Sequence, residues 1–199
     1  MKEKLVSYCR YWLLICIFML IITNCVAANR KPEFTHNLGG SPISCSIYND
    51  QASLAGIRID DPLNKVTAIL GKPQSINKSS VISVTYYYKG LKIDFMQWGE
   101  PGSPFAVANM IATSNDVATI DGVSVGMNES VLTRVYGTAD EVYTKTFTAP
   151  KLSAADNATI QRRFGLNNTV YVYNVDACNS MRFTVSNGII KEIKIHHSE

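Results

Sequence analysis

A duplicated stretch limits what this chain can fold into more than any other feature. Residues 115–137 (NDVATIDGVSVGMNESVLTRVYG) have the pattern of a strand, a tight turn and a short helix that ends on a glycine. A degenerate copy occupies residues 49–71 (NDQASLAGIRIDDPLNKVTAILG) and aligns without a gap, at a constant offset of 66 residues. Because a repeated sequence unit usually folds as a repeated structural unit, the sequence predicts two similar modules in tandem.

Each copy carries signals for a strand followed by a helix. A strand is predicted over residues 52–59, and Asp61-Pro62 predicts a helix start, while Asn128 is the expected N-cap of the second helix. Gly71 and Gly137 are expected to end the two helices. The expected core residues are Leu54, Ile57, Ile59, Leu63, Val66, Ile69 and Leu70 in the first copy and Ile120, Val123, Val125, Leu132, Val135 and Tyr136 in the second.

Three strands of an antiparallel meander are predicted after each helix. They cover residues 81–88, 91–98 and 105–113 in the first copy and residues 170–173, 181–185 and 189–195 in the second, with turns at Lys89-Gly90 and Asn187-Gly188. The predicted fold is therefore α+β, with two tandem repeats that each pack a short helix on an antiparallel sheet of about four strands. Because one short helix cannot cover such a sheet, the repeats are expected to pack together.

These signals divide the chain into segments. The sequence predicts a signal peptide over residues 1–28, an irregular leader over residues 29–48, repeat one over residues 49–114 and repeat two over residues 115–199. Repeat two contains a predicted insertion over residues 141–168, which has no counterpart of similar length in repeat one.

The N-terminus has the pattern of a secretory signal peptide. Lys2, Lys4 and Arg10 precede an apolar run over residues 11–22, and small residues follow. The run is shorter than the roughly 20 residues that a spanning helix needs, so a permanent anchor is the weaker alternative. Residues 22–25 (ITNC) resemble a bacterial lipobox, which makes lipidation of Cys25 a second alternative. We therefore predict an exported protein that is periplasmic, cell-surface or secreted.

Cysteine usage and charge restrict the chemistry. After cleavage only Cys45 and Cys178 would remain, and an exported protein is expected to pair them in a disulfide, with two free buried thiols as the alternative. No Cys-x-x-Cys unit or helical His pair predicts a metal site, and nothing indicates a cofactor. Residues 1–27 carry a net charge of +2 out of +3, so the remaining chain lacks the basic face that nucleic-acid binding needs.

Aromatic residues on the predicted strands are the candidate binding residues. Tyrosine, tryptophan and arginine are enriched at interface hot spots. The candidates are Tyr86, Tyr87, Tyr88, Trp98, Tyr171, Tyr173 and Arg182, with Lys92 and Lys194 at the rim. Because side chains alternate between the two faces of a strand, some of these residues are expected to pack in the core instead.

Short motifs in the second copy resemble those of a known superfamily. They are residues 122–131 (GVSVGMNESV), Tyr136-Gly137, Tyr171-x-Tyr173, Phe183 and residues 188–193 (GIIKEI). The pattern resembles the superfamily of the β-lactamase inhibitor protein and the small lipoproteins of outer-membrane β-barrel assembly (SmpA/OmlA type). The resemblance covers most of residues 49–199, but the first copy departs from it, with Asp60-Asp61 where the second has Gly126-Met127.

That resemblance implies an exported binding protein and not an enzyme. The inhibitor has two tandem repeats and presents a concave sheet surface to its target, but it has a disulfide within each repeat, unlike the single bridge predicted here. We therefore predict a non-enzymatic module of the bacterial cell envelope that binds an unidentified envelope or extracellular protein. It would meet a membrane only through its signal segment or a lipid anchor. A small-ligand-sensing or structural module with a pocket between the repeats is the alternative.

An enzyme is the reading that the sequence supports least. Asp60 and Asp61 form the best acidic pair, but Asp61 is already explained as a helix cap. His196 and His197 stand at the end of the sequence, and no serine lies in a G-x-S-x-G context.

Overall fold

The computed structural model describes residues 35–38, 41–100, 102–144, 168–176 and 178–197. The chain divides into two compact units, residues 1–31 and 32–199, and every described residue belongs to the second. The predicted signal peptide, Cys25 and most of the predicted insertion therefore lie outside the described residues. No helix in the described part is long and apolar enough to cross a membrane.

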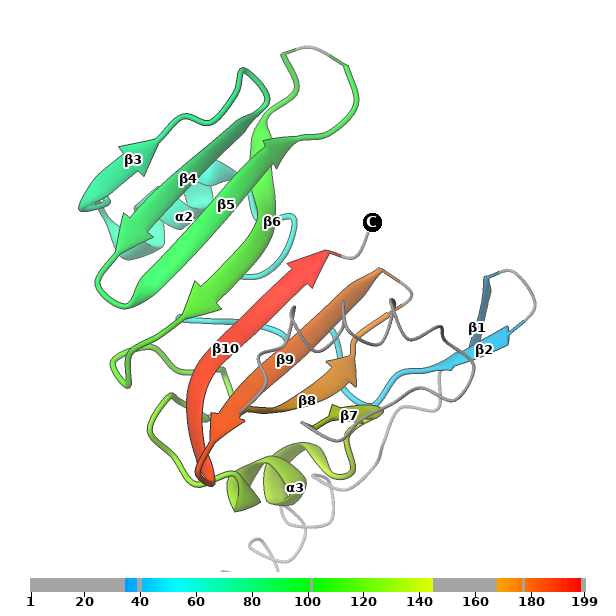
Figure 1. Ribbon diagram of the computed structural model, residues 1–199. Coiled ribbons are helices and arrows are strands. Elements are labelled where there is room, and N and C mark those ends of the chain that lie inside the picture. Colours follow the sequence, from blue (N-terminus) through cyan, green and yellow to red (C-terminus); the bar gives the residue numbers. More distant parts are fainter. Residues whose placement is uncertain (1–34, 39–40, 101, 145–167, 177, 198–199) are drawn as a thin grey trace, which may run out of the picture. The chain divides into compact units, whose positions relative to one another are not determined.

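One antiparallel sheet of eight strands forms most of the described structure (Figure 1). The spatial order is β3-β4-β5-β6-β10-β9-β8-β7. Its strands are β3 (Ser75–Asn77), β4 (Ser83–Tyr88), β5 (Leu91–Gln97), β6 (Phe105–Ala112), β7 (Glu141–Tyr143), β8 (Thr169–Asn174), β9 (Asn179–Ser186) and β10 (Ile189–His197). A separate two-stranded sheet consists of β1 (Thr35–Leu38) and β2 (Ser41–Ser44).

The prediction of an α+β fold with two helix-on-sheet repeats is wrong. The described residues contain only two short helices, α2 (Leu63–Leu70) and α3 (Ser130–Tyr136), so the fold is mainly β. The two expected sheets are one sheet because β6 and β10 pair directly, with Ile193 opposite Ala112 and Ile195 opposite Met110. The two repeats are therefore joined by backbone pairing at the middle of the sheet.

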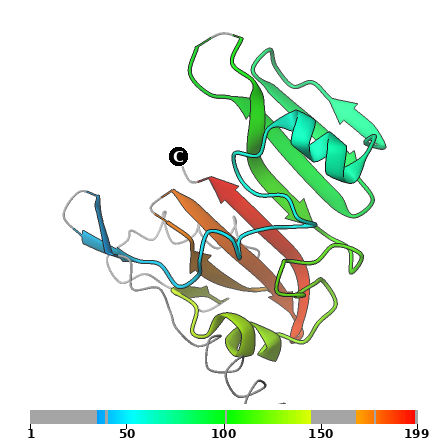
Figure 2. The same cartoon turned by 180° about the vertical axis from the view of Figure 1, so that it is seen from behind.

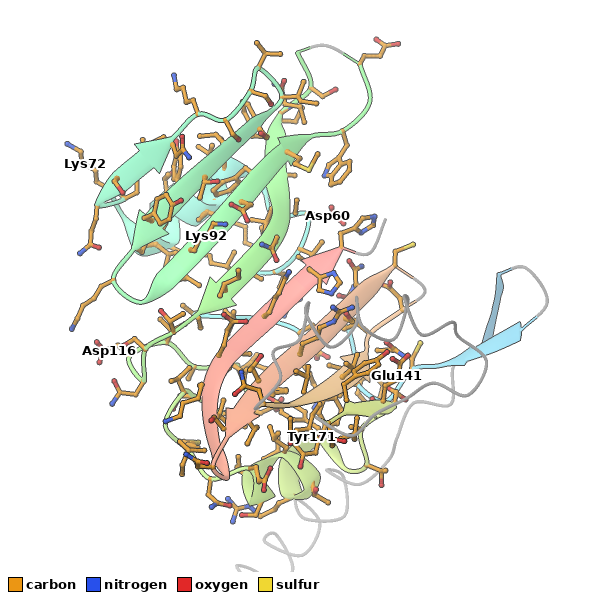
Figure 3. All side chains as sticks on the ribbon, in the orientation of Figure 1. Asp60, Lys72, Lys92, Asp116, Glu141 and Tyr171 are labelled. Atoms are coloured by element: carbon orange, nitrogen blue, oxygen red, sulfur yellow. The ribbon has the colours of Figure 1, made fainter. Side chains whose placement is uncertain are left out.

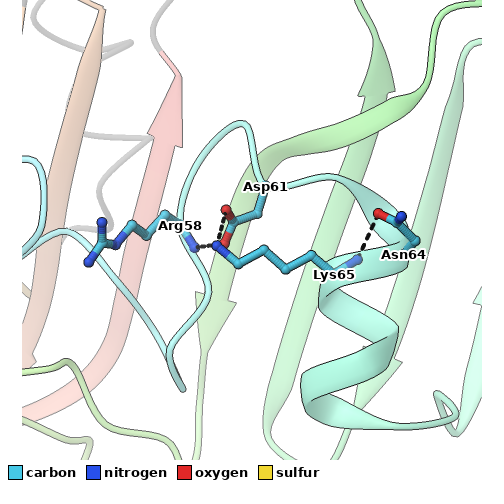
Figure 4. A network of polar contacts seen from close by, with 4 residues as sticks. All are labelled: Arg58, Asp61, Asn64 and Lys65. Atoms are coloured by element: carbon cyan, nitrogen blue, oxygen red, sulfur yellow. Dashed lines mark hydrogen bonds and ion pairs between the residues drawn. The ribbon is translucent and has the colours of Figure 1, made fainter.

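The structure confirms the helix ends but corrects both helix starts. Gly71 and Gly137 follow the helices at φ values of 73° and 77°, and each donates its backbone N–H to a threonine carbonyl one turn earlier. Asp61 does not cap α2. Its carboxylate accepts the backbone N–H of Arg58 at 2.9 Å and the Lys65 ammonium at 2.7 Å, which stabilises the approach to the helix (Figure 4).

The second helix begins one residue later than predicted. Glu129 occupies the cap position, and the side chain of Asn128 instead accepts the backbone N–H of Ser130 at 3.0 Å. Asn128 thus satisfies one of the free N–H groups of the first turn, although it lies outside the helix.

The strands predicted before the helices are tight turns. Ala55 and Gly56 both have positive φ, so the chain reverses and Leu54 exchanges backbone hydrogen bonds with Ile57. Both of these apolar residues are fully buried. The corresponding residue Ile120, which was expected in the core, is 61% exposed because it lies at the tip of the second turn, between Thr119 and Val123. The apolar pattern therefore predicted correctly that several of these residues are buried. It predicted wrongly that they form an extended strand.

The offset of 66 residues reaches further than predicted. The edge strands β3 and β7 are related by it, because Ile76 lies opposite Tyr86 as Val142 lies opposite Tyr171. Glu141–Tyr143 therefore corresponds to β3 and is not part of an insertion, so the extra length follows residue 143. The prediction missed both edge strands, since each has only three residues.

A backbone position explains why the first copy departs from the motif. Asp60 has φ 64° and Gly126 has φ 91°, and each donates its N–H to a neighbouring strand, to Val107 and Ile190 respectively. Aspartate is among the few residues other than glycine that adopt this region readily. The conformation of Asp60 (labelled in Figure 3) thus accounts for an aspartate at this position of the first copy.

This equivalence gives a stability prediction. We expect Gly126→Asp to lower the free energy of unfolding by roughly 1 kcal/mol, because aspartate tolerates positive φ, and Gly126→Val to lower it by more, because a branched Cβ does not. A Cβ added at Gly126 would have no other atom within 4 Å, so steric overlap does not contribute to the difference between the two variants. Urea unfolding measures both changes, and a valine variant as stable as the aspartate variant would contradict the equivalence.

The core lies on one face of the sheet. It is a single cluster that includes Val66 of α2, Leu132 and Tyr136 of α3, and alternate residues of the strands, such as Leu91, Ile93 and Phe95. Figure 2 shows α2 in front of the strands that it covers. Ile69 was expected on the buried side of α2 but is 49% exposed, whereas Leu63 and Leu70 pack against the core.

The leader is more ordered than predicted. β1 and β2 pair from Thr35 opposite Ser44 to Leu38 opposite Ser41. The chain then runs along the end of β8, where the N–H groups of Ser46 and Ile47 donate to the Asn174 carbonyl at 3.1 and 3.4 Å. Asp140 holds this contact, because its carboxylate accepts both the Ser46 hydroxyl and the Asn174 N–H.

Candidate functional site

The face of the sheet opposite the core is the candidate binding surface, and we call it the outer face. Side chains alternate along each strand, so Lys92 and Asp94 of β5 point away from the buried Ile93. Cross-strand pairing brings the outer-face residues of neighbouring strands into line. Two such lines cross most of the sheet, and they differ in exposure and chemistry.

The first line, which we call the polar row, contains only polar side chains. Its members, in spatial order, are Asn77, Thr85, Asp94, Asn109, His196, Ser180 and Asn174. Thr85, Ser180 and His196 are buried. Polar groups that are buried on a sheet need partners, and most of the row supplies its own.

Hydrogen bonds along the polar row hold its side chains in place. The Asp94 carboxylate accepts the Thr85 hydroxyl at 2.6 Å and the Asn109 amide N–H at 2.7 Å. On the next two strands the Ser180 hydroxyl lies 3.1 Å from His196 Nε2. Hydrogen bonds therefore restrict the side chains of the polar row, next to the more exposed residues of the outer face.

The second line, which we call the central row, is more exposed and more charged. Its members, in spatial order, are Ser75, Tyr87, Lys92, Ile111, Lys194, Arg182, Val172 and Glu141. Lys92 lies 3.1 Å from Asp94 of the polar row, and Lys194 stands directly opposite Arg182. Figure 3 labels Lys92 on β5 and Glu141 at the far edge of the sheet.

A tyrosine beside the central row reports its electrostatics. The hydroxyl of Tyr143 donates to the Glu141 carboxylate. Burial, together with this bond and the charge of Glu141, raises the pKa of Tyr143 to about 12, while the positive charge of Arg182 acts in the opposite direction. Arg182 is therefore close enough to influence the outer end of β7.

The structure separates the predicted binding residues between the two faces. Tyr87 and Trp98 are 36% and 39% exposed, and Arg182 belongs to the central row. Tyr86 and Tyr88 pack against the core, where the Tyr86 ring meets Phe95 edge-on at 5.1 Å. Three tyrosines in sequence thus divide as alternation requires, and Tyr87 is the one on the outer face.

Two of the predicted residues are structural. Tyr173 is fully buried, its hydroxyl donates to the Gly137 carbonyl at 3.3 Å, and burial raises its pKa. Its assignment as a binding residue is therefore wrong. Tyr171 also faces the helix side, where its hydroxyl donates to Glu129 at 2.9 Å, and burial followed by this bond raises its pKa.

Trp98 lies at the end of β5, where the two halves of the sheet meet. Its ring lies 5.4 Å from that of His197, the last residue of β10. His197 Nδ1 in turn lies 3.1 Å from the side-chain oxygen of Asn179, and Asn179 bonds to Asp176 in the turn before β9. Trp98 is thus held by a chain of contacts, although over a third of it stays exposed.

The predicted Cys45–Cys178 disulfide is not present in the structure, where both cysteines are free thiols. Cys45 is buried in the leader, and Cys178 is exposed in the turn before β9. Burial raises the pKa of the Cys45 thiol, and the carboxylates of Asp140 and Asp176 raise it further. A thiol that stays protonated is a poor nucleophile for disulfide formation.

The described residues also show how the catalytic candidates are placed. Ser180 and His196 form the best pair of nucleophile and base, but the serine is 3% exposed and His196 Nδ1 bonds the backbone carbonyl of the next residue. A substrate has no access to such a hydroxyl. Among the described residues, no group of three or more His, Cys, Asp or Glu side chains could hold a metal ion.

Sequence reasoning missed the polar row. It considered Lys92 and Lys194 as rim residues, but it gave no role to Thr85, Asn109 or Ser180. Alternation could have placed Thr85 and Asn109 on the outer faces of their strands, whereas Ser180 lies outside the predicted strand over residues 181–185. Their alignment depends on the pairing of β6 with β10, which no local pattern specifies.

Comparison with known proteins adds little to this geometry. No model of a known family matches the chain, and no curated protein matches it either. Similar solved structures include a DUF4309 family protein (YjgB) from Bacillus subtilis, with a TM-score of 0.40 and 13% identity over 72% of this chain and 83% of that one. An extracellular protein containing a SCP domain from Bacillus anthracis has a TM-score of 0.41 and 8% identity over 84% of this chain and 49% of that one.

Likenesses at these scores carry no argument about function. Neither description names the superfamily that the sequence motifs resemble. That resemblance therefore stays a prediction, and the functional argument rests on the residues themselves.

Proposed function

We propose that this chain is an exported, non-enzymatic protein-binding module of the bacterial cell envelope, and that the outer face of its sheet is the binding surface. The observation that carries the proposal is the composition of the central row. Tyr87, Ile111 and Arg182 combine an exposed aromatic ring, an aliphatic side chain and a guanidinium on one line. Protein interfaces are enriched in tyrosine and arginine, and the fully buried centre of an interface is more apolar than the rest of the surface.

Rigidity supports the same proposal. Binding costs conformational entropy when loose side chains must be ordered. The polar row holds Asp94 through Thr85 and Asn109, and Asp94 in turn holds Lys92. Export remains the part of the proposal that rests on the sequence, on the basic start, the short apolar run and the small residues that follow.

Site-specific photo-crosslinking in cells tests the surface. A photoreactive residue in place of Tyr87 or Trp98 is expected to give one adduct of defined mass with an envelope protein. The same residue in place of Ile69, which is exposed on the helix side, is the matched control and is expected to give none. Adducts from the Ile69 position alone, or no adduct from any position, would refute the proposed surface.

A further inference from the structure

Two lysines beside the edge strand β3 have no carboxylate partner in the described structure. Residues 62–93, which include α2, β3 and β4, contain five lysines and no aspartate or glutamate. Three of the five are paired with carboxylates from outside this stretch, in the pairs Lys65–Asp61 at 2.7 Å, Lys89–Asp116 at 2.7 Å and Lys92–Asp94 at 3.1 Å. The other two, Lys72 and Lys78, are exposed and make no ion pair with any described residue. They stand before and after β3, and Figure 3 labels Lys72 at this edge.

The backbone of β3 is open on one side. β3 is the first strand of the sheet, so among the described residues only β4 pairs with it. Its three residues, Ser75–Asn77, are all exposed. An edge strand directs part of its backbone N–H and C=O groups away from the sheet, where an extended chain can pair with them. The edge of β3 can therefore accept an added strand.

Ile76 adds an apolar contact at the centre of this edge. Its side chain is 51% exposed, although it lies opposite Tyr86, which packs against the core. At the other end of the sheet, Val142 holds the corresponding place on β7, but Glu141 stands beside it where β3 has a serine. Of these two edges, β3 is the one that combines an apolar centre with basic flanks.

The lysines also indicate which kind of strand this edge accepts. Lysines at a sheet edge oppose association with other copies of the same edge. If two β3 strands met in antiparallel pairing, the lysines of one copy would lie near those of the other, and like charges destabilise such a pair. A strand that carries negative charge would instead supply the carboxylates that Lys72 and Lys78 lack.

We propose that the edge of β3 binds an extended acidic segment of a partner protein as an added strand. The backbone of the segment pairs with β3, and a central apolar side chain of the segment packs on Ile76. Carboxylates on either side of that residue lie near Lys72 and Lys78. This inference goes beyond the proposed function, because it assigns a second surface, at the edge of the sheet, that does not depend on the outer face.

Peptide binding to the full chain tests the proposed strand addition. The probe is a fluorescein-labelled peptide, Glu-Glu-Thr-Val-Thr-Glu-Glu, and fluorescence polarisation is measured at low and at physiological ionic strength. A second peptide, Glu-Glu-Pro-Val-Pro-Glu-Glu, has the same charge and the same central valine but lacks two backbone N–H donors. It is expected to bind about tenfold more weakly. The affinity of the first peptide is expected to fall as salt rises.

Protein variants test the role of the two lysines. Lys72→Gln/Lys78→Gln is expected to bind the first peptide about fivefold more weakly, because two ion pairs are lost. Arg134→Gln/Lys191→Gln is the matched control, since it removes the same charge from exposed positions on α3 and β10 and is expected to bind like the wild type. Circular dichroism checks that both variants are folded.

Several outcomes would overturn the inference. Equal binding of the two peptides would show that no strand is added, and equal binding by Lys72→Gln/Lys78→Gln and the wild type would show that the lysines play no part. An equal loss in the Arg134/Lys191 control would reduce the effect to net charge. A dimer in sedimentation experiments that is disrupted by Ile76→Asp would assign the edge to a second copy.

The same variants distinguish this inference from the proposed function. If the Tyr87 crosslink to an envelope protein forms in cells but the first peptide does not bind, the inference fails and the outer face remains the binding surface. If the peptide binds as expected but no crosslink forms from Tyr87 or Trp98, the proposed function fails alone.

Discussion

Replacing Gly90 by alanine is expected to lower the free energy of unfolding by roughly 2–4 kcal/mol, through backbone strain and overpacking. Gly90 has φ 69° in the turn between β4 and β5, and its carbonyl accepts the N–H of Thr113. An added Cβ would lie 2.1 Å from the Cβ of Ser114, so one of the two chain segments must move. Urea unfolding followed by circular dichroism measures the loss.

Two other variants divide that loss into its causes. Gly71→Ala also places alanine at positive φ, at 73°, but meets no atom within 4 Å, so it is expected to cost only the strain of roughly 1–2 kcal/mol. Ser114→Gly in the Gly90→Ala background removes the contact with the added Cβ. It is expected to recover the part of the lost unfolding free energy by which Gly90→Ala exceeds Gly71→Ala. A Gly90→Ala protein as stable as Gly71→Ala would contradict the close approach of the turn to Ser114.

Phe183→Ala is expected to lower the free energy of unfolding by roughly 3–5 kcal/mol, the usual range for a buried aromatic side chain. Phe183 is fully buried, and its ring lies 5.5 Å from Tyr136 of α3 and 5.8 Å from Tyr173 of β8. Removing the ring leaves a cavity where α3 meets the sheet. Thermal unfolding should show a clear fall in Tm.

The adjacent residue provides the control for this second prediction. Thr184 follows Phe183 on β9 but faces the outer side, so Thr184→Ala is expected to change stability by less than about 1 kcal/mol. A large loss of stability from Thr184→Ala together with a small one from Phe183→Ala would mean that the faces are assigned the wrong way round.

Local signals predicted the parts of this fold that depend on neighbouring residues. The alternation in residues 91–95 puts Leu91, Ile93 and Phe95 on one face of a strand, and the structure buries all three. Gly71 and Gly137 end their helices as expected, because positive φ is a property of a single residue. The Asn187-Gly188 turn formed for the same reason, with φ values of 52° and 73°.

The errors arose where structure depends on distant residues. The sequence did not reveal that β6 and β10 pair, so two sheets and an α+β class were predicted instead of one sheet and a mainly β fold. The candidate site was predictable only strand by strand. Tyr87 could be assigned to the outer face by alternation, but the alignment of Lys92, Lys194 and Arg182 follows from the register of four strands.

The central pairing of β6 with β10 has a consequence for how the chain folds. The paired residues are about 80–90 positions apart in sequence, which makes the middle of the sheet its slowest part to form. Until β10 arrives, β6 (FAVANMIA) is an unpaired apolar edge, the kind of strand that recruits other chains. Newly made copies are therefore most prone to aggregate in the interval between completing the first half and docking β10, and a chaperone that acts in this interval would increase the folded yield.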